Sequence, residues 1–304
     1  MNILITGGAG FIGQTLYLEL AKLCNQVTLM DKKKIIFDQT NHIHYIQANV
    51  CDRRMMLNIF ENYQFDGVIH LAAVSRVVEA ERSPKECKET NIKGSHSLLD
   101  SIEKSQQKPW LIFGSSREVY GEQPCLPVKE NASLKPVNIY GKTKVIGEQL
   151  FYNFAKKNNL NCAIIRFSNV YGNSFDIFDR IIPKFMRAVK TGFILSIEGG
   201  DQLIDFTHIN DTIHFIITVI KYLNSKKNIQ ENFHCCPGIG WSLQELIHYI
   251  EIAVGKKAKT KKMPKRSYDV VKFVGDTAKI KNILGLNYFI SLEEGIYLSI
   301  NEYC

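Results

Sequence analysis

A glycine-rich segment directly after the first predicted strand is the feature that most limits how this chain can fold. The apolar run NILIT (2–6) leads into GGAGFIG (7–13), and helical periodicity follows. Glycines at Gly7, Gly10 and Gly13 let the backbone turn tightly and approach a pyrophosphate, whose charge is stabilised by the free N–H groups of a helix N-terminus. The strand–turn–helix order therefore predicts a dinucleotide-binding unit.

Strand and helix signals alternate through the first half of the chain. Further strands are predicted at 26–31, 43–50, 65–73, 109–116 and 161–172, and the most extended amphipathic helix at 138–159. Strict alternation implies crossover connections and a parallel sheet covered on both faces. We therefore predict an α/β fold with a Rossmann-type, doubly wound parallel sheet.

The alternation breaks after Tyr171. An irregular entry leads into a helix, and a short strand, two more helices and a further strand follow. Asn210 or Asp211 is expected near the N-cap of the helix at 208–223, whereas Ser242 and Glu245 have capping-box spacing. We predict an NAD-binding Rossmann domain over 1–172 and a smaller C-terminal α/β substrate lobe over 173–304. Segments around 205–236 are expected to return to the large sheet.

Composition restricts the setting of the protein. The 304 residues are 45% hydrophobic, which is enough for a sizeable core. The eight cysteines form no CxxC pair, and the adjacent Cys235–Cys236 reads most simply as part of a buried strand. We therefore expect no structural disulfide, no metal site and a cytoplasmic location. No apolar run reaches the roughly 18–20 residues of a membrane span, and the chain opens on a strand, so neither a span nor a signal peptide is expected.

The formal net charge is +8, and basic residues concentrate at 32–34 and 256–266. Solvated loops are the favoured interpretation of these runs, ahead of a site for a small anionic ligand. Nucleic acid comes last, because no aromatic interleaving or recognition motif accompanies the charge. No nucleic-acid partner is therefore expected.

Asp31 ends the second predicted strand, 18 residues after Gly13. A carboxylate at this place accepts hydrogen bonds from ribose hydroxyls and repels a 2′-phosphate, which favours NAD over NADP. Lys32 and Lys33 follow at once and could soften that preference.

Tyr140 and Lys144 lie four residues apart, one turn along a predicted helix. An ammonium beside a phenol stabilises the phenolate and lowers a pKa that is ~10 in model peptides. Such a tyrosine can exchange a proton with a sugar alcohol while hydride passes to a nicotinamide. The spacing alone is common by chance, but Ser116 after the fifth strand and the glycine-rich loop complete an ordered set.

With four further motifs, this set resembles the extended short-chain dehydrogenase/reductase family, in its NAD-dependent nucleotide-sugar epimerase/dehydratase branch. The matching segments are TGGAGFIG (6–13), HLAA (70–73), TN (90–91), SSREVYG (115–121), YGKTK (140–144), RFSNVYG (166–172) and RSYDV (266–270) with Asp276. They cover nearly the whole chain. The resemblance implies NAD as cofactor, a nucleotide-diphosphate sugar as substrate and a homodimer formed through two helices per subunit.

The resemblance also implies roles for individual residues. Tyr140 would be the catalytic acid or base, Lys144 would hold the nicotinamide ribose and Ser116 would hydrogen-bond the reacting C4 oxygen. Cofactor contacts are implied for Gly7, Gly10, Phe11, Ile12, Gly13, Asp31, Asn49, Val50, Leu71, Ala72, Ala73, Tyr140 and Lys144. Substrate contacts are implied for Asn169 at the diphosphate, Arg266 and Asp269 at phosphate and nucleotide ribose, and Ser75, Arg76 and Ser116 at the sugar. For the loop residues among these, a solvated side chain is the alternative.

One departure concerns the substrate side. Ile204 precedes Asp205-Phe206 where many relatives have an arginine that clamps a phosphate. Either Arg266 and nearby lysines carry that charge, or the nucleotide lies differently.

The outcome of the reaction depends on the loop after the fifth strand. In this branch hydride leaves C4 and a 4-keto sugar forms, after which 4,6-dehydratases use a glutamate to remove the C5 proton. The chain has Ser116-Arg117-Glu118, with arginine where the dehydratase acid often stands. An arginine stays protonated and is a poor proton donor to a departing hydroxyl. We therefore predict 4-epimerisation of a UDP-hexose or UDP-hexuronic acid, with Glu118 a candidate catalytic residue. Dehydration with Glu118 as C5 base is the alternative, and a non-catalytic NAD-binding protein is less favoured.

Overall fold

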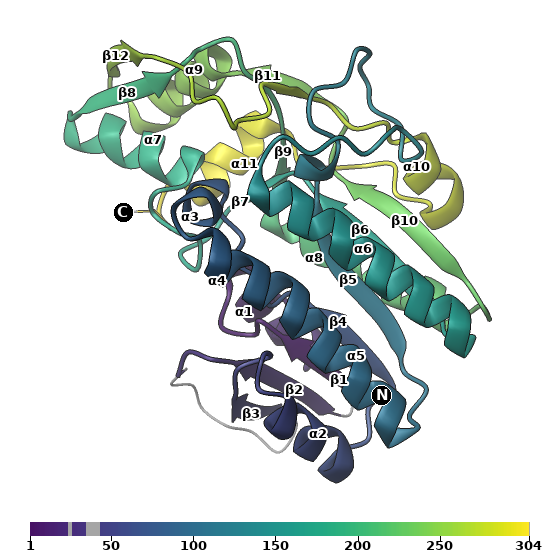
Figure 1. Ribbon diagram of the computed structural model, residues 1–304. Coiled ribbons are helices and arrows are strands. Elements are labelled where there is room, and N and C mark those ends of the chain that lie inside the picture. The colour runs from purple at the N-terminus through teal and green to yellow at the C-terminus, as the bar shows by residue number, and fades with distance from the viewer. Residues whose placement is uncertain (24–25, 35–42, 304) are drawn as a thin grey trace.

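A seven-stranded sheet, parallel throughout, organises the computed structural model, which describes residues 1–23, 26–34 and 43–303 (Figure 1). Cys24 and Cys304 lie outside the described residues. In spatial order the strands are β10 (Gln230–Cys235), β6 (Cys162–Phe167), β5 (Trp110–Ser116), β4 (Gly67–His70), β1 (Asn2–Thr6), β2 (Gln26–Asp31) and β3 (Ile43–Gln47).

Helices cover both faces of this sheet. One face carries α1 (Phe11–Leu20), α8 (Ile209–Asn224) and α10 (Ala278–Leu284), and the other carries α2 (Arg53–Asn62), α5 (Gly94–Ser105) and α6 (Ile139–Asn158). Leu16 and Ile216 belong to the first core, whereas Leu98 and Phe151 belong to the second. The predicted Rossmann-type, doubly wound sheet is confirmed.

The sheet has its topological switch point at β1. The chain runs outward from β1 through β2 to β3, then returns to β4 on the other side and continues outward through β5, β6 and β10. The connections that follow the carboxyl ends of β1 and β4 therefore leave in opposite directions. Open α/β sheets bind their ligands in the crevice between two such connections.

A smaller lobe contains the remaining strands and three packed helices, at the upper left of Figure 1. β9 (Leu203–His208) is flanked by β11 (Gly240–Ser242) and β13 (Lys272–Phe273) and also pairs with β7 (Asn169–Tyr171). β8 (Ile194–Glu198) pairs with β12 (Lys259–Met263), and α7 (Ile181–Thr191), α9 (Leu243–Val254) and α11 (Leu292–Ser299) build the core. The short helical elements α3 (Val77–Arg82), α4 (Pro84–Lys88), η1 (Glu89–Lys93) and η2 (Arg117–Val119) border the carboxyl edge of the large sheet.

Several local predictions need correction. The strand expected at 161–172 divides at Ser168 into β6 of the large sheet and β7 of the small one, where the Ser168 hydroxyl bonds the Asp205 carbonyl. The helix at 209–224 is capped by the His208 side chain instead of Asn210 or Asp211. Part of the basic run at 256–266 is not a loop but strand β12, whose residues are all exposed. The capping box of Ser242 and Glu245 is confirmed.

A buried ion pair joins α6 to the centre of the sheet. Arg166 on β6 donates from Nε and Nη2 to the two carboxylate oxygens of Glu148 on α6, at 2.9 and 2.7 Å. The hydroxyl of Ser115, near the end of β5, donates to the same carboxylate. Two-pronged geometry and a third donor offset the cost of burying both charges.

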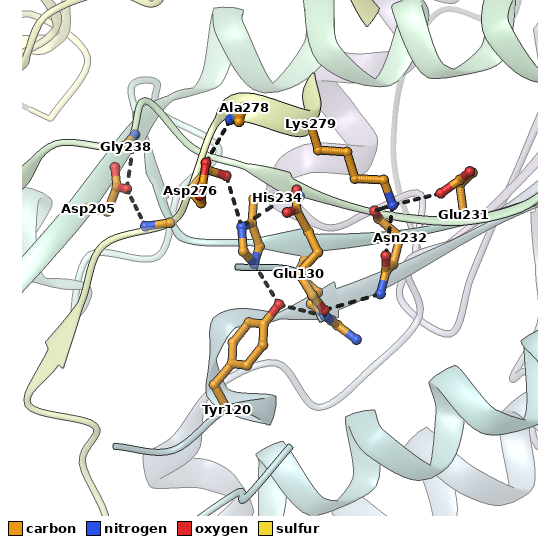
Figure 2. A network of polar contacts seen from close by, with 12 residues as sticks. Tyr120, Glu130, Asp205, Glu231, Asn232, His234, Gly238, Asp276, Ala278 and Lys279 are labelled. Carbon is orange, nitrogen blue, oxygen red and sulfur yellow. Dashed lines mark hydrogen bonds and ion pairs between the residues drawn. The ribbon is translucent and has the colours of Figure 1, made fainter. Parts of the chain in front are cut away.

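The polar network continues into the smaller lobe (Figure 2). Arg166 Nη1 also donates to the hydroxyl of Tyr120, which hydrogen-bonds His234 Nε2 at 2.6 Å. His234 Nδ1 hydrogen-bonds the carbonyl oxygen of Asp276 at 3.2 Å. Burial lowers the pKa of His234 to about 4, so the ring between Tyr120 and Asp276 is neutral. Backbone bonds from Val128 to Val274 and from Asp276 to Val128 complete the junction.

We expect Glu148→Gln to lower the free energy of unfolding by about 3 kcal/mol, because it leaves the buried Arg166 guanidinium without its counter-charge. Urea titration followed by circular dichroism measures this. Glu103→Gln is the matched control, since Glu103 pairs with Lys157 on the exposed surface, where such a pair contributes less than about 1 kcal/mol. Equal losses in the two variants would contradict the importance of the buried pair.

Candidate active site

The glycine-rich loop has the shape expected of a pyrophosphate cradle. Gly7 has a φ of +73°, and a Cβ there would lie 2.6 Å from the Ala72 nitrogen. A Cβ on Gly13 would lie 2.5 Å from the Gly7 carbonyl oxygen. No side chain caps the start of α1, and no acidic residue lies in its first turn. These free N–H groups and the missing Cβ atoms fit the pyrophosphate of NAD.

Asp31 lies at the end of β2 beside this loop. Its carboxylate accepts from the backbone N–H of Ala9 and of Lys33, both at 3.0 Å. The ammonium of Lys32, the next residue, forms an ion pair with Glu86. The carboxylate therefore holds the glycine-rich loop against β2 at the position where the cofactor ribose is expected.

The other predicted cofactor residues line the same carboxyl edge. Leu71 N donates to the Thr6 carbonyl, and Ala72 N donates to the Thr6 hydroxyl, which joins β1 to the segment after β4. Val50 is buried beside α5, and the Asn49 side chain accepts from Cys51 N. Phe11 and Ile12 open α1, Gly10 is its N-cap, and Ala73 follows Ala72 half-buried.

The structure brings Ser116, Tyr140 and Lys144 together from two different elements. Ser116 ends β5, and its hydroxyl lies close enough to the Tyr140 phenol to act on the pKa of that phenol. The Lys144 ammonium lies 5.7 Å from the Tyr140 ring centroid and donates to the Gly114 carbonyl at 2.6 Å. Close approach of α6 makes this possible, because a Cβ on Gly147 would lie 2.3 Å from the Phe113 ring.

Burial dominates the electrostatics of this trio. It raises the pKa of the Tyr140 phenol, while the Ser116 hydrogen bond and the charge of Arg180 act in the opposite direction. The expectation that the pKa of Tyr140 lies below its ordinary value is therefore wrong, since desolvation outweighs the contributions of Ser116 and Arg180. Burial also lowers the pKa of Lys144 to about 8.

Glu118 is buried, and both of its carboxylate oxygens are occupied. Oε1 pairs with Arg117 Nη2 at 3.1 Å, and Oε2 accepts from Asn138 Nδ2 at 2.7 Å. Asn138 is also the N-cap of α6, through its acceptor bond from Gly141 N. The carboxylate is thus fixed between the loop after β5 and the start of the catalytic helix.

The predicted substrate residues are spread over both lobes. Ser75 is exposed, and Arg76 pairs with Glu79 and Asp179. Asn169 begins β7, half-buried. Arg266 pairs with Asp269 at 2.7 Å and with Glu198 at 3.1 Å. Ile204 is buried in the core of the smaller lobe, so no cation stands at its position.

Sequence reasoning missed three residues that shape the site. Asn138 had a detectable signal, since it is the first residue of the predicted helix at 138–159 and asparagine is a preferred N-cap. Asn91 lies on the π-helix η1, bonds both backbone groups of Val74 and donates to the Thr143 hydroxyl on α6. Arg180 places its guanidinium 5.9 Å from the Phe11 ring centroid and pairs with the buried Asp176. Asn91 stands in the matching TN segment (90–91), from which no role was assigned to it, and no sequence pattern indicates the contacts of Arg180.

The part of the chain that the structure describes lacks two further classes of feature. No cluster of three or more His, Cys, Asp or Glu side chains there has the arrangement of a metal site. None of the helices in this part of the chain is both long and apolar enough to span a membrane.

The chain is similar to known proteins over almost its full length. UDP-glucose 4-epimerase of Lactobacillus helveticus is 27% identical, over 94% of this chain and 91% of that protein. The structure of Thermotoga maritima UDP-glucose 4-epimerase with UDP-glucose is 29% identical with a TM-score of 0.92, covering 100% of this chain and 98% of that one. MoeE5 in complex with UDP-glucuronic acid and NAD is 25% identical with a TM-score of 0.89, covering 99% and 98%.

The model of the NAD dependent epimerase/dehydratase family matches residues 3–234, which include the glycine-rich loop, Ser116, Tyr140 and Lys144. The chain therefore belongs to the NAD-dependent epimerase/dehydratase family.

Proposed function

We propose that this protein is an NAD-dependent nucleotide-sugar 4-epimerase that acts on a UDP-sugar through a transient 4-keto sugar. The observation that carries the choice of reaction is the state of Glu118, whose two oxygens are bound by Arg117 and Asn138. A base that removes the C5 proton needs an oxygen directed at the sugar, whereas the oxygens of Glu118 are directed at these two protein partners. The similarity to UDP-glucose 4-epimerases supports both the reaction and the nucleotide.

In the proposed mechanism Tyr140 exchanges the proton of the C4 hydroxyl, and Ser116 holds the C4 oxygen by a hydrogen bond. The chemistry that bound NAD would supply is to take up the hydride from C4 and give it back to the ketone. Lys144 holds the nicotinamide ribose, Asp31 the adenosine ribose and the N-terminus of α1 the pyrophosphate. Asn169, Arg266 and Asp269 hold the nucleotide diphosphate, while Ser75 and Arg76 contact the sugar. Release of the ketone and rebinding by its other face explain inversion without a further base.

A 4,6-dehydratase using Glu118 as the C5 base is the second candidate, and its support is the presence of that glutamate beside Ser116. As the C5 base, Glu118 would have to direct a remaining lone pair at the C5 proton while it is held by Asn138 and Arg117. A non-catalytic NAD-binding protein is less favoured, because Ser116, Tyr140 and Lys144 are assembled in one cluster.

The proposal extends to the organisation of the protein. Residues 1–172 are assigned to cofactor binding, together with segments around 205–236, and the rest of 173–304 to substrate binding. A homodimer through α5 and α6 is supported by the exposed apolar side chains Ile146 and Tyr152 on α6. A cytoplasmic location is supported by the free thiols of the described cysteines.

Tyr140→Phe should lower kcat for epimerisation of a UDP-sugar by at least about 100-fold, since positioned acid–base groups contribute on the order of 10²–10⁴. The fold should persist, because the ring is retained. A coupled assay with UDP-glucose and UDP-glucuronate measures the rate. Tyr152→Phe, on the exposed face of the same helix, should keep the original rate. Unchanged turnover in Tyr140→Phe would favour the non-catalytic reading.

Glu118→Gln separates epimerase from dehydratase. An epimerase should retain activity within about 10-fold, because the amide can still bond Arg117 and the loss is that of one charge-assisted hydrogen bond. Mass spectrometry of the nucleotide sugar should show an unchanged mass in both proteins. Loss of one water in the product of the original protein, abolished by Glu118→Gln, would establish dehydration instead.

NAD affinity should fall as pH rises above about 8. The pKa of Lys144 is lowered to about 8, so the ammonium that is expected to hold the ribose is lost through that range. If only the ammonium form binds, the dissociation constant rises up to about tenfold per pH unit above the pKa. Calorimetric titrations from pH 7 to 9.5 measure this dissociation constant.

The Lys144→Met variant should bind NAD weakly, with a dissociation constant that does not change with pH. The Lys142→Met variant, which is altered at an exposed position, should keep the pH dependence of the original protein. A flat profile in the original protein would contradict the role of Lys144.

A further inference from the structure

Arg117 is a buried cation with an unused donor. The residue is only 9% exposed, although it lies in the loop directly after Ser116. Nη2 pairs with Glu118 at 3.1 Å, and the guanidinium carbon lies 5.9 Å from the Phe273 ring centroid. Nη1 is fully buried and has no hydrogen-bond partner in the structure.

A buried guanidinium with an unpaired donor destabilises the folded state. A guanidinium carries five N–H donors and stays protonated, so each donor shielded from water without an acceptor raises the free energy of the folded state. Buried polar groups are nearly always paired, and an exception calls for an explanation. Packing alone would be served better by an aliphatic side chain beside Phe273. The spare donor is therefore best explained by a ligand that supplies an acceptor.

The position of Arg117 limits which ligand group can reach it. Ser116, the preceding residue, hydrogen-bonds Tyr140, which is proposed to act at the C4 oxygen. Glu118, the ion-pair partner of Arg117, lies close enough to Tyr140 for its charge to raise the pKa of the phenol. An acceptor on the sugar, on a carbon close to C4, is the one that this position favours. The diphosphate, attached at C1 across the ring, is assigned to Asn169 and Arg266 on other elements.

Charge distinguishes the possible sugars. A hexose offers only hydroxyl groups near C4, and a neutral donor such as an amide would bind these at a smaller desolvation cost than a guanidinium. A hexuronate carries a carboxylate on C5, the ring carbon next to C4. Guanidinium and carboxylate form strong charge-assisted hydrogen bonds in a water-poor site.

The contacts of Glu118 are compatible with a second carboxylate on Arg117. Asn138 donates a hydrogen bond to one carboxylate oxygen of Glu118, and Arg117 pairs with the other oxygen. The guanidinium thus has Nη1 left for a further acceptor, and Glu118 supplies the counter-charge while the sugar site holds no carboxylate.

We propose that Arg117 is the specificity-determining residue that binds the C6 carboxylate of the sugar, so that the substrate is a nucleotide-linked hexuronate rather than a neutral hexose. This inference rests on the proposed 4-epimerase function. It assigns Arg117 to substrate recognition and Glu118 to holding the guanidinium in place.

The test compares kcat/KM for UDP-glucuronate and UDP-glucose in the same preparation of the full-length protein with NAD. The original protein should prefer UDP-glucuronate by at least about 10-fold, because a hydrogen bond to a charged group corresponds to a factor of roughly 10–150. Arg117→Met should remove that preference by lowering kcat/KM for UDP-glucuronate alone. A merely structural role would lower both values together, so the ratio is the decisive readout.

Arg117→Met leaves Glu118 buried without its ion-pair partner and could unfold the loop. The double variant Arg117→Met, Glu118→Gln removes both charges and keeps a neutral site, and its substrate ratio should match that of Arg117→Met. Glu118→Gln alone keeps the guanidinium and should retain the preference for UDP-glucuronate.

A preference of the original protein for UDP-glucose would overturn the inference, and so would an unchanged ratio in the double variant. Either result would leave the proposed 4-epimerase function intact. Failure to epimerise both substrates would instead count against that function and, with it, the inference.

Discussion

The buried pair of Arg166 and Glu148 is the interaction on which the site depends most. Glu148 lies one turn after Lys144 on α6, and its carboxylate also receives the hydroxyl of Ser115, the neighbour of Ser116. One carboxylate thus fixes the end of β5 and the catalytic helix to the same point of the sheet. The separation of Ser116, Tyr140 and Lys144 is therefore set by a contact that involves none of them.

The same arginine also links the two lobes. Through Tyr120 and His234 the network reaches the backbone of Asp276, near the end of the segment that carries Arg266 and Asp269 (Figure 2). A neutral histidine suits this position, because it can accept from one side and donate to the other. The residues proposed for the nucleotide are thereby placed relative to the residues proposed for the sugar.

The parts that the sequence predicts well are those with a local cause. Gly7 and Gly13 follow a strand and open a helix, and no other residue would tolerate the contacts found there. Ser116 follows an apolar run, so the carboxyl edge of a parallel sheet is its expected place. The hydrogen bond between Asn138 and Glu118 and the π-helix contacts of Asn91 join residues distant in sequence, and periodicity carries no information about them. The pKa of Tyr140 was mispredicted for a related reason, because spacing shows Lys144 but does not show how deeply the phenol is buried.

Charge on the proposed substrate side differs from the expectation of an arginine directly before Asp205-Phe206. Ile204 packs in the core of the smaller lobe, so an arginine there would require that core to rearrange. Arg266 is already paired with Asp269 and Glu198, and any phosphate that it binds must compete with these carboxylates. Arg117, by contrast, holds a donor that no protein group occupies. Of Arg117 and Arg266, the cation with more to gain from an anionic ligand is therefore the one that follows Ser116, and under our proposal the sugar is the part of the substrate that it selects.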